Sequence, residues 1–237
     1  MSPKIPAGFR AAAALVKPVL LGSTRRVWSG SEHLPADRGF IAVSNHVTYA
    51  DPFTFAHYLY DHGFAPHFLA KASLFDLPVA GRFLAHLDQV PVHRGGSQAR
   101  DAVEASAKLL ARGDSIAVFP EGTLTRDPEM WPMLARTGAA RMALEYDVPV
   151  VPVAQWGAHQ LLAPYSKRPN LCPRKTVTVQ AGPPVDLEEF RGRPLDIEVL
   201  RGATDRIMAT LTSMLEEIRG ETAPPKPWDM RREGGGR

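Results

Sequence analysis

A single cysteine, Cys172, is present among the 237 residues of the chain. One thiol excludes an intrachain disulfide and a cluster of thiolate metal ligands, and it agrees with a reducing compartment. The chain has no run of about 20 consecutive apolar residues, the length that a membrane-spanning helix needs. It also has no block of about five or six like charges. The net charge of +3 is too small to indicate nucleic acid, so we expect no nucleic-acid partner.

Several motifs of well-known enzymes are also absent. The sequence contains no G-x-S-x-G nucleophile motif, no P-loop and no G-x-G-x-x-G turn. His57, His62 and His67 are spaced by five residues, which is a poor helical spacing for metal ligands. We therefore expect no catalytic serine of that type and no metal site.

Short apolar segments that alternate with helical patterns predict an α/β fold, a single domain with a largely parallel central sheet flanked by helices. Segment 148–154 is apolar and extended, but its prolines argue against a plain central strand. The other strands are expected at 39–44, 67–71, 89–92, 115–119 and 175–182, and a last helix at about 196–219. We place the globular domain at 27–219, before a loosely ordered tail at 220–237.

The N-terminal segment, residues 1–26, is predicted to form an amphipathic helix. It has no acidic residue, and its apolar stretch 7–22 is interrupted by Lys17 and Pro18. Such a helix can lie in the interface of an anionic membrane, or it can pack on the core like any amphipathic helix. Its five cations are Lys4, Arg10, Lys17, Arg25 and Arg26.

Polar residues follow four of the predicted strands. Ligands of open α/β sheets bind outside the carboxyl ends of the strands, so these residues are candidates for one site. They are Asn45 and His46 after the first strand, Lys71 at the end of the second, His93 and Arg94 after 89–92, and the segment "FPEGTLTR" at 119–126. A phosphate could be bound there by Lys71, Arg94, Arg126 or Arg136.

His46 and Asp51 form the pattern H-x-x-x-x-D at the start of a predicted helix. If the turn folds back, the carboxylate can reach a ring nitrogen and leave the other nitrogen to act as a general base. Alternatively, Asp51 only caps the helix and His46 is an ordinary turn residue. The pattern by itself is too loose to decide between them.

The order of these motifs resembles the glycerolipid acyltransferase family, of which lysophosphatidic acid acyltransferase is typical. That family has N-H-x-x-x-x-D, a lysine-bearing segment, a stretch that ends in Arg-Gly, F-P-E-G-T, and an apolar segment with a proline. Here these are "NHVTYAD", "AKASLFDLPVAGRFL", "VPVHRG", "FPEGT" and the segment around Pro152, a span of 108 residues from 45 to 152.

The resemblance implies transfer of an acyl group from acyl-CoA or acyl carrier protein to a glycerolipid hydroxyl, without a bound cofactor. It implies that His46 is the general base and that Asp51 orients it. The product would be phosphatidic acid, made from lysophosphatidic acid in phospholipid biosynthesis. The implied location is the cytoplasmic face of the cell membrane. The protein would bind peripherally to the anionic surface of that membrane. The implied substrate-binding residues are Asn45, Lys71, Arg94, Glu121, Gly122, Thr123 and Arg126.

One position departs from the family pattern. Many members have arginine directly after F-P-E-G-T, whereas this chain has Leu124 there and its nearest arginine is Arg126. The acceptor is therefore open to alternatives: glycerol 3-phosphate, another lysophospholipid or a glycolipid. A membrane-binding protein without turnover is the alternative from another class, although binding alone would not require a base.

Overall fold

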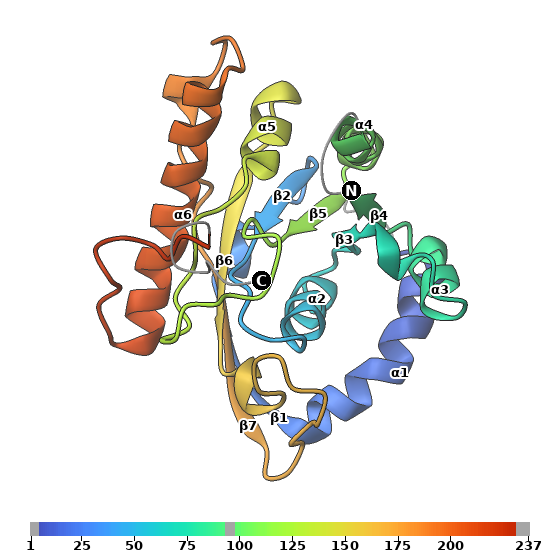
Figure 1. The fold of residues 1–237 in the computed structure, drawn as a ribbon. Coiled ribbons are helices and arrows are strands. Elements are labelled where there is room, and N and C mark those ends of the chain that lie inside the picture. The colour runs from blue at the N-terminus through green and yellow to red at the C-terminus, as the bar shows by residue number, and fades with distance from the viewer. Residues whose placement is uncertain (1–4, 93–97, 231–237) are drawn as a thin grey trace.

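A seven-stranded sheet forms the centre of the protein (Figure 1), in the order β1-β7-β6-β2-β5-β3-β4. The structure, a computed structural model, describes residues 5–92 and 98–230. The five strands from β6 to β4 are parallel, whereas β7 is antiparallel to β6, and β1 is parallel to β7. The strands are β1 Thr24–Ser29, β2 Phe40–Val43, β3 Pro66–Lys71, β4 Val90–Val92, β5 Ser115–Val118, β6 Val150–Trp156 and β7 Lys175–Ala181. The predicted largely parallel sheet is confirmed.

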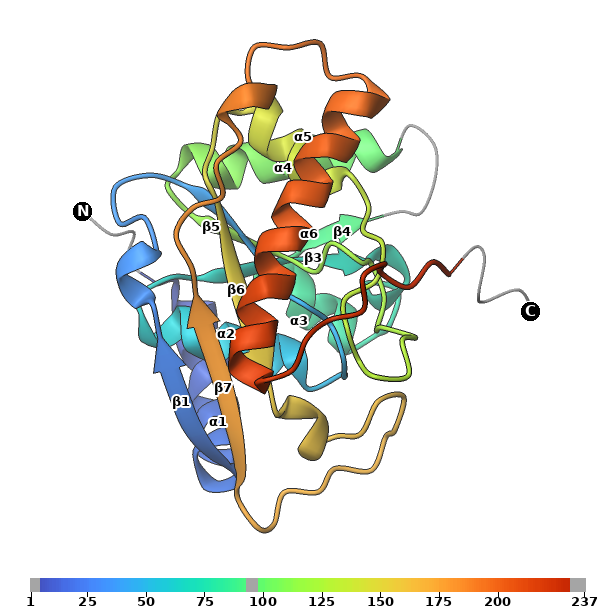
Figure 2. The same cartoon turned by 90° about the vertical axis from the view of Figure 1, so that its left-hand side faces the viewer.

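Helices cover both faces of this sheet (Figure 2). On one face α4, α5 and α6 pack on the side chains of β2, β5 and β6, and on the other face α2 packs on β2, β6 and β7. The α-helices are α1 Ala7–Ser23, α2 Asp51–Asp61, α3 Ala80–His86, α4 Gln98–Ala111, α5 Gly138–Glu145 and α6 Ile197–Arg219. Short 3-10 helices lie at Ser31–His33, Ala72–Leu74, Ala158–Gln160 and Glu188–Phe190.

The prediction that segment 148–154 is extended is confirmed, whereas the argument that its prolines disfavour a central strand is wrong. β6 lies between β2 and β7, and Pro152 pairs with Val43 of β2. A proline is tolerated here because pairing with β7 begins one residue later, at Val153. The missing N–H of Pro152 therefore breaks no bond of that ladder, while its carbonyl accepts from the Gly182 N–H.

The N-terminal helix is α1, which packs beside α2 and α3 through the buried Phe9 (Figure 1). Lys17 on α1 and Arg26 on β1 both form ion pairs with Asp61 of α2. Two of the five N-terminal cations thus share one carboxylate that is distant in sequence, which leaves the trio with a net charge of about +1. The predicted border at residue 26 falls inside β1. No helix within residues 5–92 and 98–230 is both long and apolar enough to cross a bilayer.

Residues 220–230, the described part of the predicted tail, make contacts with the rest of the protein. The Ala223 N–H donates to the Glu216 carboxylate, and the Leu134 N–H donates to the Trp228 carbonyl. The guanidinium of Arg219, at the end of α6, stacks between Trp131 and Trp156, with its carbon 3.7 and 4.3 Å from the ring centroids. The last described segment therefore supports the loop that follows β5.

Candidate active site

The parallel arrangement of β2, β3 and β5 brings the predicted polar residues to one edge of the sheet. His46 follows β2, Lys71 ends β3, and Phe119 to Thr123 follow β5. The ring of His46 stacks on Phe119 with centroids 4.0 Å apart, and the Thr125 N–H donates to the His46 carbonyl at 2.7 Å. The two motifs, 73 residues apart in sequence, are thus in direct contact.

Asp51 fixes the orientation of the His46 ring. Its Oδ2 lies 3.1 Å from His46 Nδ1 and also accepts the backbone N–H groups of Val47 and Thr48, at 2.6 and 2.7 Å. A carboxylate can only accept, so Nδ1 carries the proton and Nε2 keeps its lone pair. Because Asp51 is buried and held by two amides, the ring has a defined tautomer, as a general base requires.

Asn45 has a positioning role in the fold. Its side-chain amide is buried, donates to the Gln155 carbonyl and accepts from the Gln155 N–H, both at 2.9 Å. Gln155 in turn accepts from the Thr54 hydroxyl at 2.7 Å and donates to Ser44 at 3.1 Å. Asn45 therefore ties the turn after β2 to β6, and its polar atoms are used inside the protein. Gln155 was not singled out in the sequence, since no motif includes it.

Glu121 is likewise buried, and its two oxygens accept backbone N–H groups from two segments. Oε1 accepts from His46 at 3.0 Å, and Oε2 accepts from Met133 at 2.9 Å. Burial raises the pKa of Glu121 to about 8, and the two N–H donors oppose this rise. Glu121 links the backbone of the candidate base to the loop that the C-terminal segment supports.

This raised pKa predicts a pH dependence of stability. Between about pH 4.5 and 8 the folded protein keeps a proton on Glu121 that the unfolded chain has released. The contribution of Glu121 to the free energy of unfolding is therefore greatest below pH 4.5 and falls as the pH rises towards 8. A Glu121→Gln variant cannot titrate, and its amide can accept through only one of two polar atoms. At about pH 5.5 the variant should have a lower thermal unfolding midpoint than the wild type. This difference in midpoint, the stability gap, should be smaller at about pH 8.5.

Thermal unfolding midpoints of both proteins at the two pH values measure this gap. The comparison cancels every titrating group that the two proteins share. A gap that stays constant or widens with pH would contradict the assignment of the titration to Glu121.

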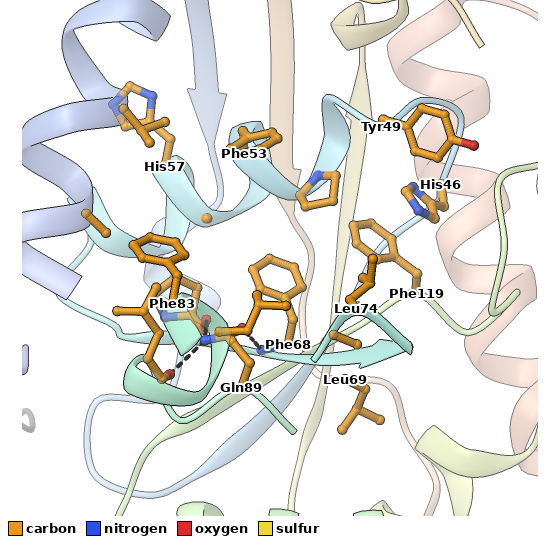
Figure 3. Close-up of a pocket in the computed structure, with 18 of the residues that line it drawn as sticks. His46, Tyr49, Phe53, His57, Phe68, Leu69, Leu74, Phe83, Gln89 and Phe119 are labelled. Atoms are coloured by element: carbon orange, nitrogen blue, oxygen red, sulfur yellow. Dashed lines mark hydrogen bonds between the residues drawn. The ribbon is translucent and has the colours of Figure 1, made fainter. Parts of the chain in front are cut away.

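A large apolar cavity opens beside His46 (Figure 3), with a volume of about 630 Å³. His46, Tyr49 and Phe119 lie at one side of it, and His57 and Phe83 lie towards the opposite side. Its walls come from α1, α2, β3 and α3 and include Val16, Leu20, Phe53, Phe68, Leu84 and Leu87. We call it the first cavity; its lining suits a hydrocarbon chain.

A second cavity of about 550 Å³ adjoins the first and shares Leu69, Lys71, Phe119 and Gly122 with it. It extends between β3, α4, α5 and α6, and its lining contains Arg136, Arg141 and Arg201. Lys71 therefore lies where the two cavities meet. Sequence reasoning named Arg136 only as one of several possible phosphate contacts, because no motif distinguished it from other surface arginines.

The remaining predicted binding residues differ in their placement. Gly122 lines both cavities and Thr123 lines the first. Arg126 is exposed and lies outside the lining of both cavities. Leu124, at the position where arginine is common in the resembling family, is buried against the first cavity. Arg94 lies outside the described residues.

Known proteins resemble this chain in sequence. The model of the family described as Acyltransferase matches residues 25–156, more than half of the chain. A chloroplastic 1-acyl-sn-glycerol-3-phosphate acyltransferase of Brassica napus is 31% identical over 135 residues, covering 56% of this chain and 38% of the relative. An enzyme of the same name from Bacillus subtilis is 32% identical over 129 residues, covering 53% of this chain and 60% of the relative.

A similar fold is known from the crystal structure of the 1-acyl-sn-glycerophosphate acyltransferase PlsC of Thermotoga maritima. It has a TM-score of 0.63 and 26% sequence identity, and the match covers 91% of this chain and 84% of that one. The chain spans 36% to 60% of the length of the first four curated relatives that it matches.

Proposed function

The chain belongs to the Acyltransferase family, and from this membership we propose that it is an O-acyltransferase that converts 1-acyl-sn-glycerol 3-phosphate to phosphatidic acid. The acyl donor in this proposal is a thioester, acyl-CoA or acyl carrier protein. The observation that carries the proposal is the His46–Asp51 pair beside the first cavity, with Nδ1 and Oδ2 3.1 Å apart. A base fixed beside an apolar cavity suits a lipid hydroxyl as the nucleophile.

In the proposed reaction, His46 Nε2 removes the proton from the acceptor hydroxyl as its oxygen attacks the thioester carbonyl. The carbon–sulfur bond then breaks, and the thiolate takes the proton from His46. Asp51 stabilises the imidazolium that exists between these steps, because its charge lies next to Nδ1–H. No acyl-enzyme is formed. The apolar ring of Phe119, which stacks on His46, lowers the local dielectric constant and so strengthens the attraction between Asp51 and the imidazolium.

The acceptor is proposed to place its phosphate near Lys71, which reaches both cavities. Arg94 is expected to add a second cation from the segment after β4. Arg126 has no support for this role, since it lies outside both linings. Because Leu124 brings no charge to the site, acylation of glycerol 3-phosphate, another lysophospholipid or a glycolipid is the second candidate.

A panel of acceptors tests the proposed function directly. Purified protein is given radiolabelled acyl-CoA or acyl carrier protein together with lysophosphatidic acid, glycerol 3-phosphate, a second lysophospholipid or a glycolipid. Lysophosphatidic acid should give the highest kcat/KM. A preference for an acceptor without phosphate would move the function to the glycolipid candidate. Absence of transfer to every acceptor would favour a lipid-binding protein without turnover.

We further propose that the protein acts at the cytoplasmic face of the membrane, to which it binds peripherally. Exposed apolar side chains lie on or next to the helices that form the walls of the first cavity; this apolar rim consists of Leu15, Val19, Tyr49, Phe53, Leu74, Leu77, Val79 and Phe83. Four of them, Tyr49, Phe53, Leu74 and Phe83, also line the cavity itself. Insertion of this rim into the interface would let a lipid enter the cavity without crossing water.

Membrane binding can be tested without removing α1, whose Phe9 belongs to the core. Leu15 and Val19 are 80% and 52% exposed, so their replacement by serine should leave the fold intact. The double variant should bind anionic vesicles about tenfold or more weakly, since two apolar side chains no longer insert. Vesicle sedimentation measures the partition coefficient.

Ile197→Ser is the matched control, because Ile197 is an exposed apolar residue of α6 outside the rim, with an exposure of 69%. Equal binding by the double variant and this control would argue against the rim. So would a wild-type protein that stays in the supernatant with anionic vesicles.

A further inference from the structure

The lining of the second cavity is positively charged. Among the described residues it contains Arg136, Arg141 and Arg201, with Lys71 at the border to the first cavity, and one carboxylate, Glu145. Cations that share a wall repel one another, and such a wall attracts anions into the cavity. The cations come from β3, the loop before α5, α5 itself and α6, so only the folded chain brings them together.

Most of these cations have no ion-pair partner among the described residues. Within residues 5–92 and 98–230, neither Arg136 nor Arg141 has a carboxylate at ion-pair distance, and the same holds for Lys71. Arg201 donates to the Ala135 carbonyl at 2.9 Å, which holds the segment next to Arg136. Gly122 makes room for Arg136: a Cβ there would lie 2.9 Å from its Nε. Arg136 and Arg141 can therefore bind an anion without breaking an ion pair, and the remaining donors of Arg201 can join them.

The size and charge of the cavity indicate which anion fits. A single phosphomonoester carries roughly two negative charges, and Lys71 already serves it where the cavities meet. The second cavity is far larger than one phosphate group, and its three arginines suit a ligand with several phosphates. A thioester whose acyl chain lies in the first cavity would extend its carrier past Phe119 into the second. A nucleotide carrier has the required size and charge.

We propose that the second cavity binds the phosphate groups of the nucleotide carrier of the thioester donor through Arg136, Arg141 and Arg201. This proposal rests on the proposed acyl transfer and assigns the donor to the class of coenzyme A thioesters. It separates the two substrates in space: the carrier lies between α5 and α6, and the acceptor phosphate lies at Lys71.

The first test is direct binding, which needs no turnover. Calorimetric titration of the full chain with free coenzyme A should give a Kd that rises about tenfold or more in Arg136→Gln and in Arg141→Gln, as each loses a charge-assisted contact. Arg193→Gln is the matched control, because Arg193 is exposed and lies outside both linings. Thermal melts verify that the variants fold, and 3′-dephospho-coenzyme A should bind more weakly than coenzyme A.

Steady-state kinetics then separates donor from acceptor. Arg136→Gln and Arg141→Gln should raise KM for acyl-CoA and leave KM for the acceptor within about twofold. A rise in the acceptor KM alone, or unchanged coenzyme A binding in both folded variants, would overturn the proposal. Use of acyl carrier protein with no binding of coenzyme A would also overturn it. If coenzyme A binds as predicted but no acceptor is acylated, the proposed function fails while the carrier site stands.

Discussion

Replacement of His46 by alanine is expected to lower kcat by about 10²–10⁴-fold, the usual contribution of a general base. In the wild type the His46 ring is held by Asp51 and by stacking on Phe119 beside the first cavity. Alanine removes the only group at this position that can accept the acceptor's proton. KM for the donor should change little, because the cavities keep their other walls. Initial rates with saturating acyl-CoA and acceptor measure the effect.

Two further variants make this result specific. His46→Gln preserves a polar side chain beside Asp51 but cannot act as a base at neutral pH, so it should be as inactive as alanine. His33→Ala removes a histidine from the 3-10 helix Ser31–His33, which lines neither cavity, and should retain full activity. A folded His46→Ala protein with near wild-type kcat would refute the mechanism.

Sequence reasoning located the site because of the sheet. Parallel strands have their carboxyl ends on one edge, so the polar residues after β2, β3 and β5 had to meet once the strands were recognised. The helix at Asp51 and the strand at 115–118 follow from local patterns that are strong on their own. The contact between His46 and Phe119 is a consequence of that topology. A sequence pattern can predict such a contact once it has identified the two parallel strands.

Other features depend on contacts that no local pattern encodes. β1, with sequence TRRVWS, has no apolar alternation; it is an edge strand that pairs with β7, and its Arg26 forms an ion pair with Asp61. Asn45 and Glu121 also use their side-chain polar atoms on backbone groups of distant segments. Both residues hold the backbone segments of the site in place. A sequence motif does not distinguish such a residue from one that contacts the ligand.

Asp51→Asn should lower kcat by about 10²-fold or more while it leaves the fold and the His46 tautomer in place. The N–H groups of Val47 and Thr48 both point at one oxygen of Asp51, so the asparagine must present its oxygen there and turn its NH₂ away. That oxygen can still accept from His46 Nδ1. What the variant loses is the negative charge that stabilises the imidazolium during the transfer, and only the rate should depend on it.

Asp196→Asn is the matched control for this substitution. Asp196 is the N-cap of α6, where its carboxylate accepts the Val199 N–H at 2.9 Å, and it lies outside both cavities. Asparagine caps a helix about as well as aspartate, so Asp196→Asn should keep a thermal midpoint close to that of the wild type. Asp51→Asn should do so too, because its side-chain oxygen still accepts the Val47 and Thr48 N–H groups. The control should keep its full rate, whereas Asp51→Asn should lose it. If Asp51→Asn loses activity only in proportion to unfolding, Asp51 serves the helix start, and the base acts without a charged partner.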